Sequence, residues 1–103
     1  MSVVVSVRNG NISETLKEYA ENKVSKLIED YPIITSIKVI LDMQKTRSKA
    51  EIIVRGKSTE VEADVETYDM YESIDKVVEK AHSQLKKHHD KLQNHRKGQG
   101  KEE

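Results

Sequence analysis

The sequence predicts an α+β fold in which a four-stranded sheet packs one face against two helices. Four segments alternate apolar and polar residues, which is typical of half-buried strands. Two segments repeat apolar residues at helical spacing. These segments follow the order β-α-β-β-β-α along the chain. A sheet with one apolar face is buried when both helices cover that face, so this order favours a two-layer α+β sandwich.

The first two elements are a strand and a helix. The alternation over residues 3–8 predicts the strand, and Asn9-Gly10-Asn11 predicts the turn that ends it. Ser13 is a good helix N-cap, and Glu14 lies in the first turn, where the helix dipole favours an acid. Pro32 should end this helix, because proline disfavours helical geometry at the residue before it.

Three strands should follow, over residues 37–43, 49–55 and 60–66. The links between them are short, which favours antiparallel hairpins. Gly56 is expected to supply the positive φ of a tight turn. A right-handed crossover through the first helix would make the first two strands parallel neighbours.

The last element is a long helix. Asp69 followed three residues later by Glu72 predicts a capping box at its start. Apolar residues keep helical spacing as far as Leu92, whereas residues 96–103 hold two glycines and no apolar residue. We therefore expect one domain over residues 1–95 and a flexible C-terminal tail over residues 96–103.

Composition limits the class of protein. A chain of 103 residues suits one domain, and the absence of cysteine excludes disulfides and thiolate metal sites. No segment approaches the run of about 18 apolar residues that a membrane span needs, and no signal peptide is visible. We expect a soluble, cytoplasmic protein that makes no membrane contact.

Charge is sorted along the chain although the total is zero, with 18 bases and 18 acids. Residues 58–75 hold seven acids and no Lys or Arg, whereas residues 76–101 hold eight bases and two acids. Residues 38–57 hold six bases and two acids. Such blocks create local electrostatic fields even when the total cancels.

Lysines of the last helix form a row. At about 100° per residue, Lys76, Lys80, Lys87 and Lys91 fall on one face, away from the apolar stripe, and Lys86 extends the charge around the helix. One interpretation is an ordinary solvated face with cations near the helix C-terminus. The other is a surface that binds phosphates and releases their counterions.

Two smaller basic groups have the same two interpretations. Lys23 and Lys26 follow Tyr19 at helical spacing on the first helix. In the first interpretation their aliphatic stems cover the edge of the core, and in the second they form one basic surface with the lysines of the last helix. Lys45 and Arg47 belong to the loop QKTRSK. This loop is either an ordinary polar hairpin tip or an additional contact with the phosphate backbone of a nucleic acid. If the basic surface covers the helices, the acids of residues 60–66 would point to the opposite, open face of the sheet. The domain would then be dipolar, with positive charge over the helices and negative charge over part of the sheet.

The histidines do not predict a metal site. His82, His88, His89 and His95 are separated by six, one and six residues, which is not the i, i+3 or i, i+4 spacing of a helical metal pair. His88, His89 and His95 are better candidates for a contact or a stack on RNA. Catalytic and phosphate-loop motifs are absent from the sequence, so we expect no enzyme, no cofactor and no small-molecule substrate.

The segment DMYESIDKVVEKAHSQLKKHHDKL resembles the second helix of the ribosome hibernation promoting factor family, also called protein Y, ribosome-associated inhibitor or sigma-54 modulation protein. The matching positions of this helix are Asp69-Met70-Tyr71, Ile74-Asp75, Lys80, Gln84-Leu85, Lys87-His88, Asp90-Lys91-Leu92 and His95. Those of the first helix are Ile12-Ser13-Glu14, Leu16, Lys23 and Lys26-Leu27.

The resemblance implies a fold similar to double-stranded-RNA-binding domains. It also implies a stress or stationary-phase factor whose partners are the small ribosomal subunit and its ribosomal RNA. Such a factor occupies the decoding region, blocks transfer RNA and messenger RNA, and silences and protects idle ribosomes. The resemblance implies that the lysines at matching positions contact the rRNA backbone, namely Lys23, Lys26, Lys80, Lys87 and Lys91. Residues on or beside the same face join them, namely Lys76 and Lys86. Additional candidate contacts are Lys45, Arg47, His88 and His95.

The sequence also departs from the family. Ser83 and His89 stand where relatives can carry bases, which makes this face less positive. The short end after His95 resembles the short type of the family, which lacks a C-terminal dimerisation domain. The alternative function is a protein-interaction modulator of the sigma-54 modulation type, without direct rRNA binding.

Overall fold

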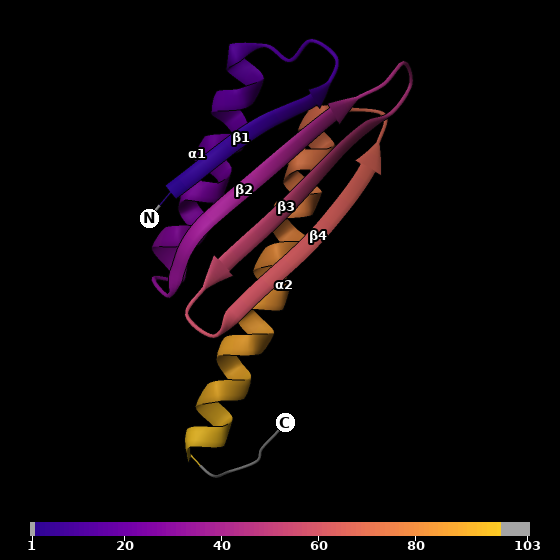
Figure 1. The fold of residues 1–103 in the computed structure, drawn as a ribbon. Helices are drawn as coiled ribbons and strands as arrows, with labels where there is room; N and C mark the ends of the chain where they lie inside the picture. The colour runs from indigo at the N-terminus through magenta and orange to yellow at the C-terminus, as the bar shows by residue number, and fades with distance from the viewer. Residues whose placement is uncertain (1, 98–103) are drawn as a thin grey trace.

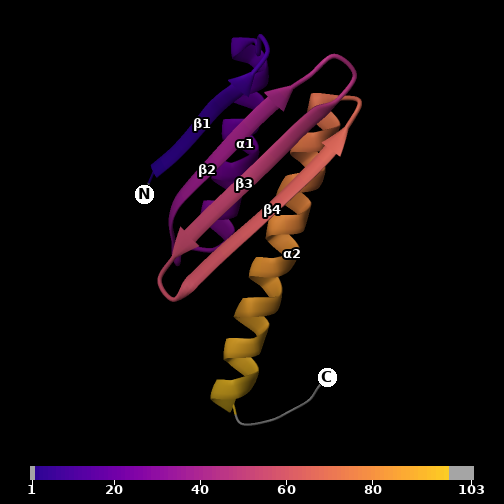
Figure 2. The ribbon, with the colours of Figure 1, turned by 45° about the vertical axis from the view of Figure 1, so that its right-hand side comes forward.

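The six elements form in the predicted order. The computed structural model describes residues 2–97, and the side chains of residues 2–87. The elements are β1 (Ser2–Asn9), α1 (Glu14–Asp30), β2 (Ile34–Met43), β3 (Ser48–Gly56), β4 (Thr59–Thr67) and α2 (Met70–Lys97). Both helices lie on one face of the sheet, and the last turns of α2 extend beyond it (Figures 1 and 2). The predicted fold class is confirmed.

The four strands form one sheet in the order β1-β2-β3-β4. β1 pairs parallel with β2, with Val3 opposite Ile37, because α1 carries the chain back between them. β2 with β3 and β3 with β4 are antiparallel hairpins, so that Ile52 lies between Val39 and Ala63. The predicted parallel neighbours and hairpins are confirmed.

The core lies between the sheet and the helices. Each strand points alternate side chains toward the helices, and each helix contributes the residues of its apolar stripe. Ile37, Val39 and Leu41 of the central strand β2 are at most 1% exposed. The other buried apolar residues are Leu16, Ala20, Val24, Leu27, Ile34, Ala50, Ile52, Val54, Val61, Met70, Ile74, Val77, Ala81 and Leu85.

Local signals define where the helices begin and end. Ser13 caps α1, since its Oγ accepts a hydrogen bond from the Leu16 amide at 3.1 Å, and the helix ends before Pro32 with Tyr31 as C-cap. Asp69 caps α2 through its Oδ1, which accepts from the Tyr71 amide at 3.2 Å.

The reciprocal half of the predicted capping box is replaced by another contact. The Asp69 amide donates to Oγ1 of Thr67 at 3.1 Å, in the place of the Glu72 carboxylate. Glu72 instead pairs with Lys76 one turn further along α2, at 3.1 Å. Thr67 precedes Asp69 by two residues, so this contact is as local as the capping box that it replaces.

Gly56 is required for a reason other than the predicted one. The positive φ of the β3–β4 turn belongs to Ser58, at 57°, so the prediction for Gly56 was wrong. A Cβ at Gly56 would lie 2.5 Å from the carbonyl oxygen of Ile33, so glycine allows the turn before β2 to pack against the end of β3. In the predicted Asn9–Asn11 turn, Gly10 has φ 86°.

The open face of the sheet is mixed in charge. The acids of β4 are exposed and point away from the helices, as predicted. However, bases in and beside β3 lie next to them and offset their charge. The ion pairs are Arg47–Glu66 at 3.2 Å, Lys49–Asp64 at 3.5 Å and Arg55–Glu60 at 3.4 Å. Pairing therefore weakens the predicted acidic field on this face.

The helix α2 continues to Lys97, two residues past the predicted end of the domain at residue 95. The remainder of the predicted tail, residues 98–103, lies outside the described residues. No helix within residues 2–97 is long and apolar enough to cross a membrane.

Candidate nucleic-acid interface

The basic side chains of α1 lie at the border of its buried stripe. Val24 and Leu27 are at most 2% exposed and hold the helix on the sheet. Lys23 and Lys26 precede them by one residue each, so they emerge beside the core. Lys23 is half-buried and Lys26 is exposed. Both predicted lysines of α1 are therefore accessible from solvent.

A polar cluster joins α1 to α2 at this border. The hydroxyl of Tyr19 donates a hydrogen bond to Oδ1 of Asp75, and Lys23 Nζ lies 3.4 Å from the same oxygen. Lys23 Nζ also lies 5.6 Å from the centre of the Tyr19 ring, and Tyr71 packs edge-on against that ring at 4.9 Å. The cluster holds Lys23 in one position between the helices.

The Asp75 carboxylate changes the titration of its two partners. By accepting the hydrogen bond of Tyr19 it raises the pKa of that phenol, with burial and charge adding to the effect. Its negative charge raises the pKa of Lys23. Both shifts extend the protonated range of the phenol and of the ammonium upward from their ordinary pKa values of 10.0 and 10.5.

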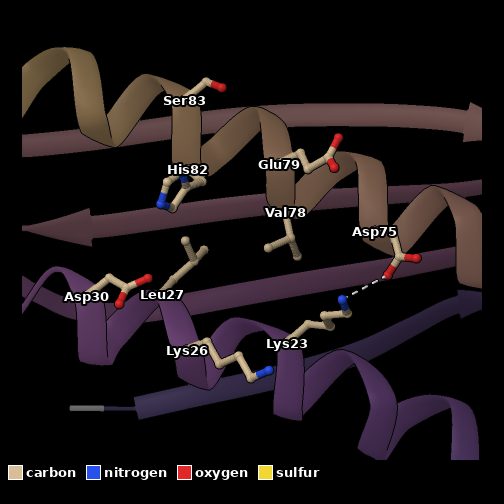
Figure 3. A pocket seen from close by; sticks show the side chains of 9 residues that line it. All are labelled: Lys23, Lys26, Leu27, Asp30, Asp75, Val78, Glu79, His82 and Ser83. Carbon is tan, nitrogen blue, oxygen red and sulfur yellow. Dashed lines mark ion pairs between the residues drawn. The ribbon is translucent and has the colours of Figure 1, made fainter.

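A groove of about 430 Å³ runs between the two helices. Figure 3 shows Lys23 and Lys26 on the α1 side, and Leu27 and Val78 between the helices. On the α2 side of the groove, His82 lies among acidic and polar side chains. The remaining lining residues are Asp30, Asp75, Glu79 and Ser83. The two bases of this groove thus lie on the α1 side, and its acids lie on both sides.

His82 is the histidine of the predicted set whose side chain the structure describes. Its ring lies edge-on to Tyr31 with centres 5.4 Å apart, and Nε2 lies 3.5 Å from the Tyr31 hydroxyl. Both residues are at the end of the inter-helix groove distant from Tyr19. Among the described side chains, no three His, Asp or Glu residues gather closely enough to hold a metal ion.

The first lysines of α2 lean toward β4 rather than toward α1. Lys76 pairs with Glu72, and Lys80 Nζ donates to the carbonyl oxygen of Asp64 at 3.3 Å. Both line a second groove between α2 and β4, and Glu79 borders both grooves. The lysines of the two helices are therefore separated by acids, and do not form the continuous basic surface that was one of the two interpretations of the sequence.

Lys86 and Lys87 differ from Lys76 and Lys80 in that no ion pair or hydrogen bond among residues 2–87 engages their side chains. Both are exposed, and neither takes part in an ion pair among residues 2–87. Three other predicted site residues, His88, Lys91 and His95, belong to α2, but their side chains lie outside the described residues. The same holds for His89.

The loop residues Lys45 and Arg47 lie elsewhere. They connect β2 to β3 beside the first turn of α2 (Figure 1). Lys86 follows that turn by about 24 Å along the helix, at 1.5 Å per residue. Arg47 is paired with Glu66, whereas Lys45 is exposed and has no ion pair among residues 2–87. The structure does not bring this loop together with the later lysines of α2.

Sequence reasoning missed the part that aromatic and acidic residues play here. Asp75 was visible as one acid in an acidic block and as a position that matches the family, but its partner Tyr19 precedes it by 56 residues. Tyr68, which is 83% exposed beside the β2–β3 loop, carried no pattern of its own. No local spacing could have indicated either role, because both depend on how the helices and strands pack.

The fold and this surface define a class: a small α+β domain whose two neighbouring helices both carry lysines that are accessible from solvent. The chain belongs to the family described as "Sigma 54 modulation protein / S30EA ribosomal protein", whose model matches residues 3–93. The resemblance seen in the helix motifs is thereby confirmed.

Relatives match over nearly the whole chain. A protein of Azotobacter vinelandii named ribosome hibernation promoting factor is 34% identical over 99 residues, covering 96% of this chain and 92% of the relative. The protein of that name from Escherichia coli K12 is 32% identical over 95 residues, covering 92% of this chain and all of the relative.

Two solved structures share the fold. A ribosomal subunit interface protein from Coxiella burnetii superposes with a TM-score of 0.80 at 24% identity, covering 87% of this chain and 99% of the other. The N-terminal domain of Protein Y from Thermus thermophilus superposes with a TM-score of 0.75 at 28% identity, covering 84% of this chain and 98% of that domain.

Proposed function

We propose that this protein is a ribosome hibernation factor that binds the small ribosomal subunit in the decoding region, contacts its ribosomal RNA and blocks transfer RNA and messenger RNA. The carrying observation is that the accessible lysines of α1 and α2 belong to a domain whose relatives, matched over 92% and all of their length, are named ribosome hibernation promoting factor. A ribosomal partner implies action in the cytoplasm.

The proposed mechanism is occlusion anchored by charge. Lys26, Lys86 and Lys87 are exposed and make no ion pair within residues 2–87, so they can approach phosphates without breaking an internal contact. Each phosphate that a lysine neutralises releases condensed counterions, which drives binding at low salt. The rigid sheet and helices then fill the space that ligands of the subunit need. This mechanism requires no catalytic group.

The acids near the lysines moderate this attraction. Lys23 and Lys76 are already paired, with Asp75 and Glu72, so a phosphate must compete with a carboxylate for them. Exposed pairs of this kind contribute only about 0–1 kcal/mol, so an RNA backbone can displace them. Affinity should therefore depend strongly on salt. Binding of this kind is reversible, so the protein can be released when ribosomes resume translation.

Co-sedimentation with small subunits tests the proposal. The protein should sediment with subunits of its own species at low salt and dissociate as salt rises. Replacing Lys86 and Lys87 by Gln should weaken binding and lower the slope of log K against log salt by about 1.4 to 1.8, at 0.7 to 0.9 per phosphate contact.

The matched control removes two charges from the open face of the sheet, in the double variant Arg8→Gln/Lys38→Gln, and should leave the slope unchanged. Failure of the unaltered protein to sediment with subunits would favour the alternative, a protein-interaction modulator of the kind that the words "sigma 54 modulation" in the family description suggest. Equal effects of the two double variants would argue against the helical lysines as the anchor.

A further inference from the structure

A third groove, of about 280 Å³, lies at the end of the sheet where α2 begins. Residues of the β2–β3 loop and of the start of α2 line it. These two segments lie at the same end of the sheet (Figure 1). Tyr68 and Tyr71 line the groove and are 83% and 40% exposed. The whole chain has four aromatic residues, so two exposed tyrosines in one groove are a local concentration.

The backbone around Tyr68 is fixed although its ring is free. On one side, Oγ1 of Thr67 accepts a hydrogen bond from the Asp69 amide and lies 2.7 Å from Oγ of Ser73. Ser73 is fully buried and donates to the carbonyl oxygen of Ser48 at 2.6 Å. The Tyr68 ring is thus a flat apolar surface held on a rigid base, with no ring contact to another aromatic residue among residues 2–87.

The second tyrosine is also positioned. Tyr71 lies in the first turn of α2 and packs edge-on against Tyr19, with ring centres 4.9 Å apart. Tyr19 in turn is held by Asp75. An edge-on contact leaves much of the Tyr71 ring accessible, so the groove has aromatic surface from two residues three positions apart.

A cation stands beside these rings. The loop that carries Lys45 is closed by two backbone hydrogen bonds between Gln44 and Arg47, at 2.8 and 3.3 Å. The charges of Arg47 and Asp69 are engaged, by Glu66 and by the Tyr71 amide. The Asp69 carboxylate keeps its negative charge, but Lys45 has no ion pair among residues 2–87, so Lys45 is the cation that is open to a ligand of this groove.

We propose that this groove binds one unpaired nucleotide of RNA, with its base stacked on Tyr68 beside Tyr71 and its phosphate on Lys45. Stacking on tyrosine with a neighbouring cation is how proteins hold single-stranded nucleic acid, because every base has a flat π face. A paired base hides its faces in the helix stack, so the ligand must be unpaired. The inference rests on the proposed function and adds a base contact to the backbone contacts of the helical lysines.

A tryptophan reporter tests the stacking. The chain has no tryptophan, so the variant Tyr68→Trp carries a single tryptophan, which lies in the groove and can be excited selectively near 295 nm. Its emission should be quenched when small subunits bind, and also by a single-stranded oligoadenylate at low salt. The control Val4→Trp places the fluorophore on the exposed, open face of the sheet and should keep its emission.

Affinity for the subunit gives a second readout. Tyr68→Phe keeps an aromatic plane and should bind like the original, whereas Tyr68→Leu should bind about 5- to 150-fold more weakly, the effect of losing one stacked base. Lys45→Gln should lower the salt slope by about 0.7 to 0.9. Tyr68 is so exposed that none of these changes should disturb the fold.

Different failures lead to different conclusions. If the original protein sediments with subunits but Tyr68→Leu binds equally well, the stacking proposal is overturned and the proposed function stands. Quenching by subunits but not by the oligoadenylate would indicate a protein surface in the groove and would also overturn it. If the original protein does not bind subunits at all, the proposed function fails, and this inference with it.

Discussion

The phenolic hydroxyl of Tyr19 on α1 donates a hydrogen bond to Oδ1 of Asp75 on α2 at 2.5 Å. The same oxygen pairs with Lys23, so one carboxylate joins the two helices and positions a predicted RNA-binding lysine. The contact lies beside the groove between the helices. It therefore links the packing of the domain to the surface proposed for RNA.

Replacing Asp75 by Asn should shift the titration of Tyr19. Asp75 raises the pKa of Tyr19, mainly as acceptor of its hydrogen bond, and raises that of Lys23, mainly through its charge. In Asp75→Asn one tyrosine should ionise at lower pH, as measured by absorbance near 295 nm. Tyr19→Phe should remove that titration step. Identical curves for the original and Asp75→Asn would show that the contact does not persist in solution.

The same contact predicts how stability depends on pH. Both pKa values are raised above their ordinary values of 10.0 and 10.5, so the stabilisation is fully present below about pH 10. It is lost as the pH rises through the higher values of the folded state. The difference in Tm between the original and Asp75→Asn should therefore shrink above pH 10, as measured by thermal unfolding. A difference that grows there would contradict this reasoning.

Ser73→Ala should destabilise the fold. Ser73 is buried, and its hydroxyl is the donor to the Ser48 carbonyl at 2.6 Å. Removing the hydroxyl leaves that carbonyl without its partner, at a cost of about 1–3 kcal/mol in the free energy of unfolding, measurable by urea denaturation. The control Ser83→Ala changes an exposed serine of the same helix and should cost less than about 0.5 kcal/mol. Equal stability of the two variants would be evidence against the role of Ser73.

Two changes in the β3–β4 turn should have opposite effects on stability. Gly56→Ala forces a Cβ to within 2.5 Å of the Ile33 carbonyl oxygen and should destabilise by about 1–3 kcal/mol. Ser58→Gly relieves a non-glycine residue at φ 57° and should stabilise by up to about 1 kcal/mol. Denaturant unfolding of both variants measures the contrast. If Gly56→Ala were neutral, the close approach would not exist in solution.

Glu79→Gln should strengthen binding to the small subunit. Glu79 borders the groove between the helices and the groove between α2 and β4, and it has no ion pair among residues 2–87. Its charge therefore repels an approaching phosphate. Its removal should raise affinity about two- to fivefold at low salt, the range of an exposed charge interaction, and less at high salt. Glu51→Gln removes a carboxylate from the open face of the sheet and should have no effect. A gain in both variants would point to net charge rather than to this surface.

Much of the fold was predictable because its signals are local. The alternation in the strands and the helical spacing of Leu16, Ala20 and Val24 each depend on a few neighbouring residues. Caps are local too, and Ser13 and Asp69 begin the helices where predicted. The turn at Gly56 was not predictable, since its glycine serves a contact with Ile33 from another part of the chain.

The candidate site was predictable only as a set of cations. Helical periodicity correctly separated Lys76, Lys80 and Lys87 from the buried stripe. Periodicity within α2 could not show that Lys80 leans on the Asp64 carbonyl of β4, because that contact depends on how the helix lies across the sheet. Pairing with neighbours, rather than position along the helix, decides which lysines remain open to a phosphate.

By itself, the sequence determined the six elements, their order and the family, because periodicity, capping residues and the DMY motif are properties of short segments. Only the tertiary structure decided which charges are free and which groups meet. It placed Tyr19 against Asp75 across 56 residues, and it brought Tyr68 beside the loop that carries Lys45. The physical reason is that electrostatic pairing and stacking depend on distances of a few ångströms in space, and packing of helices on the sheet sets those distances.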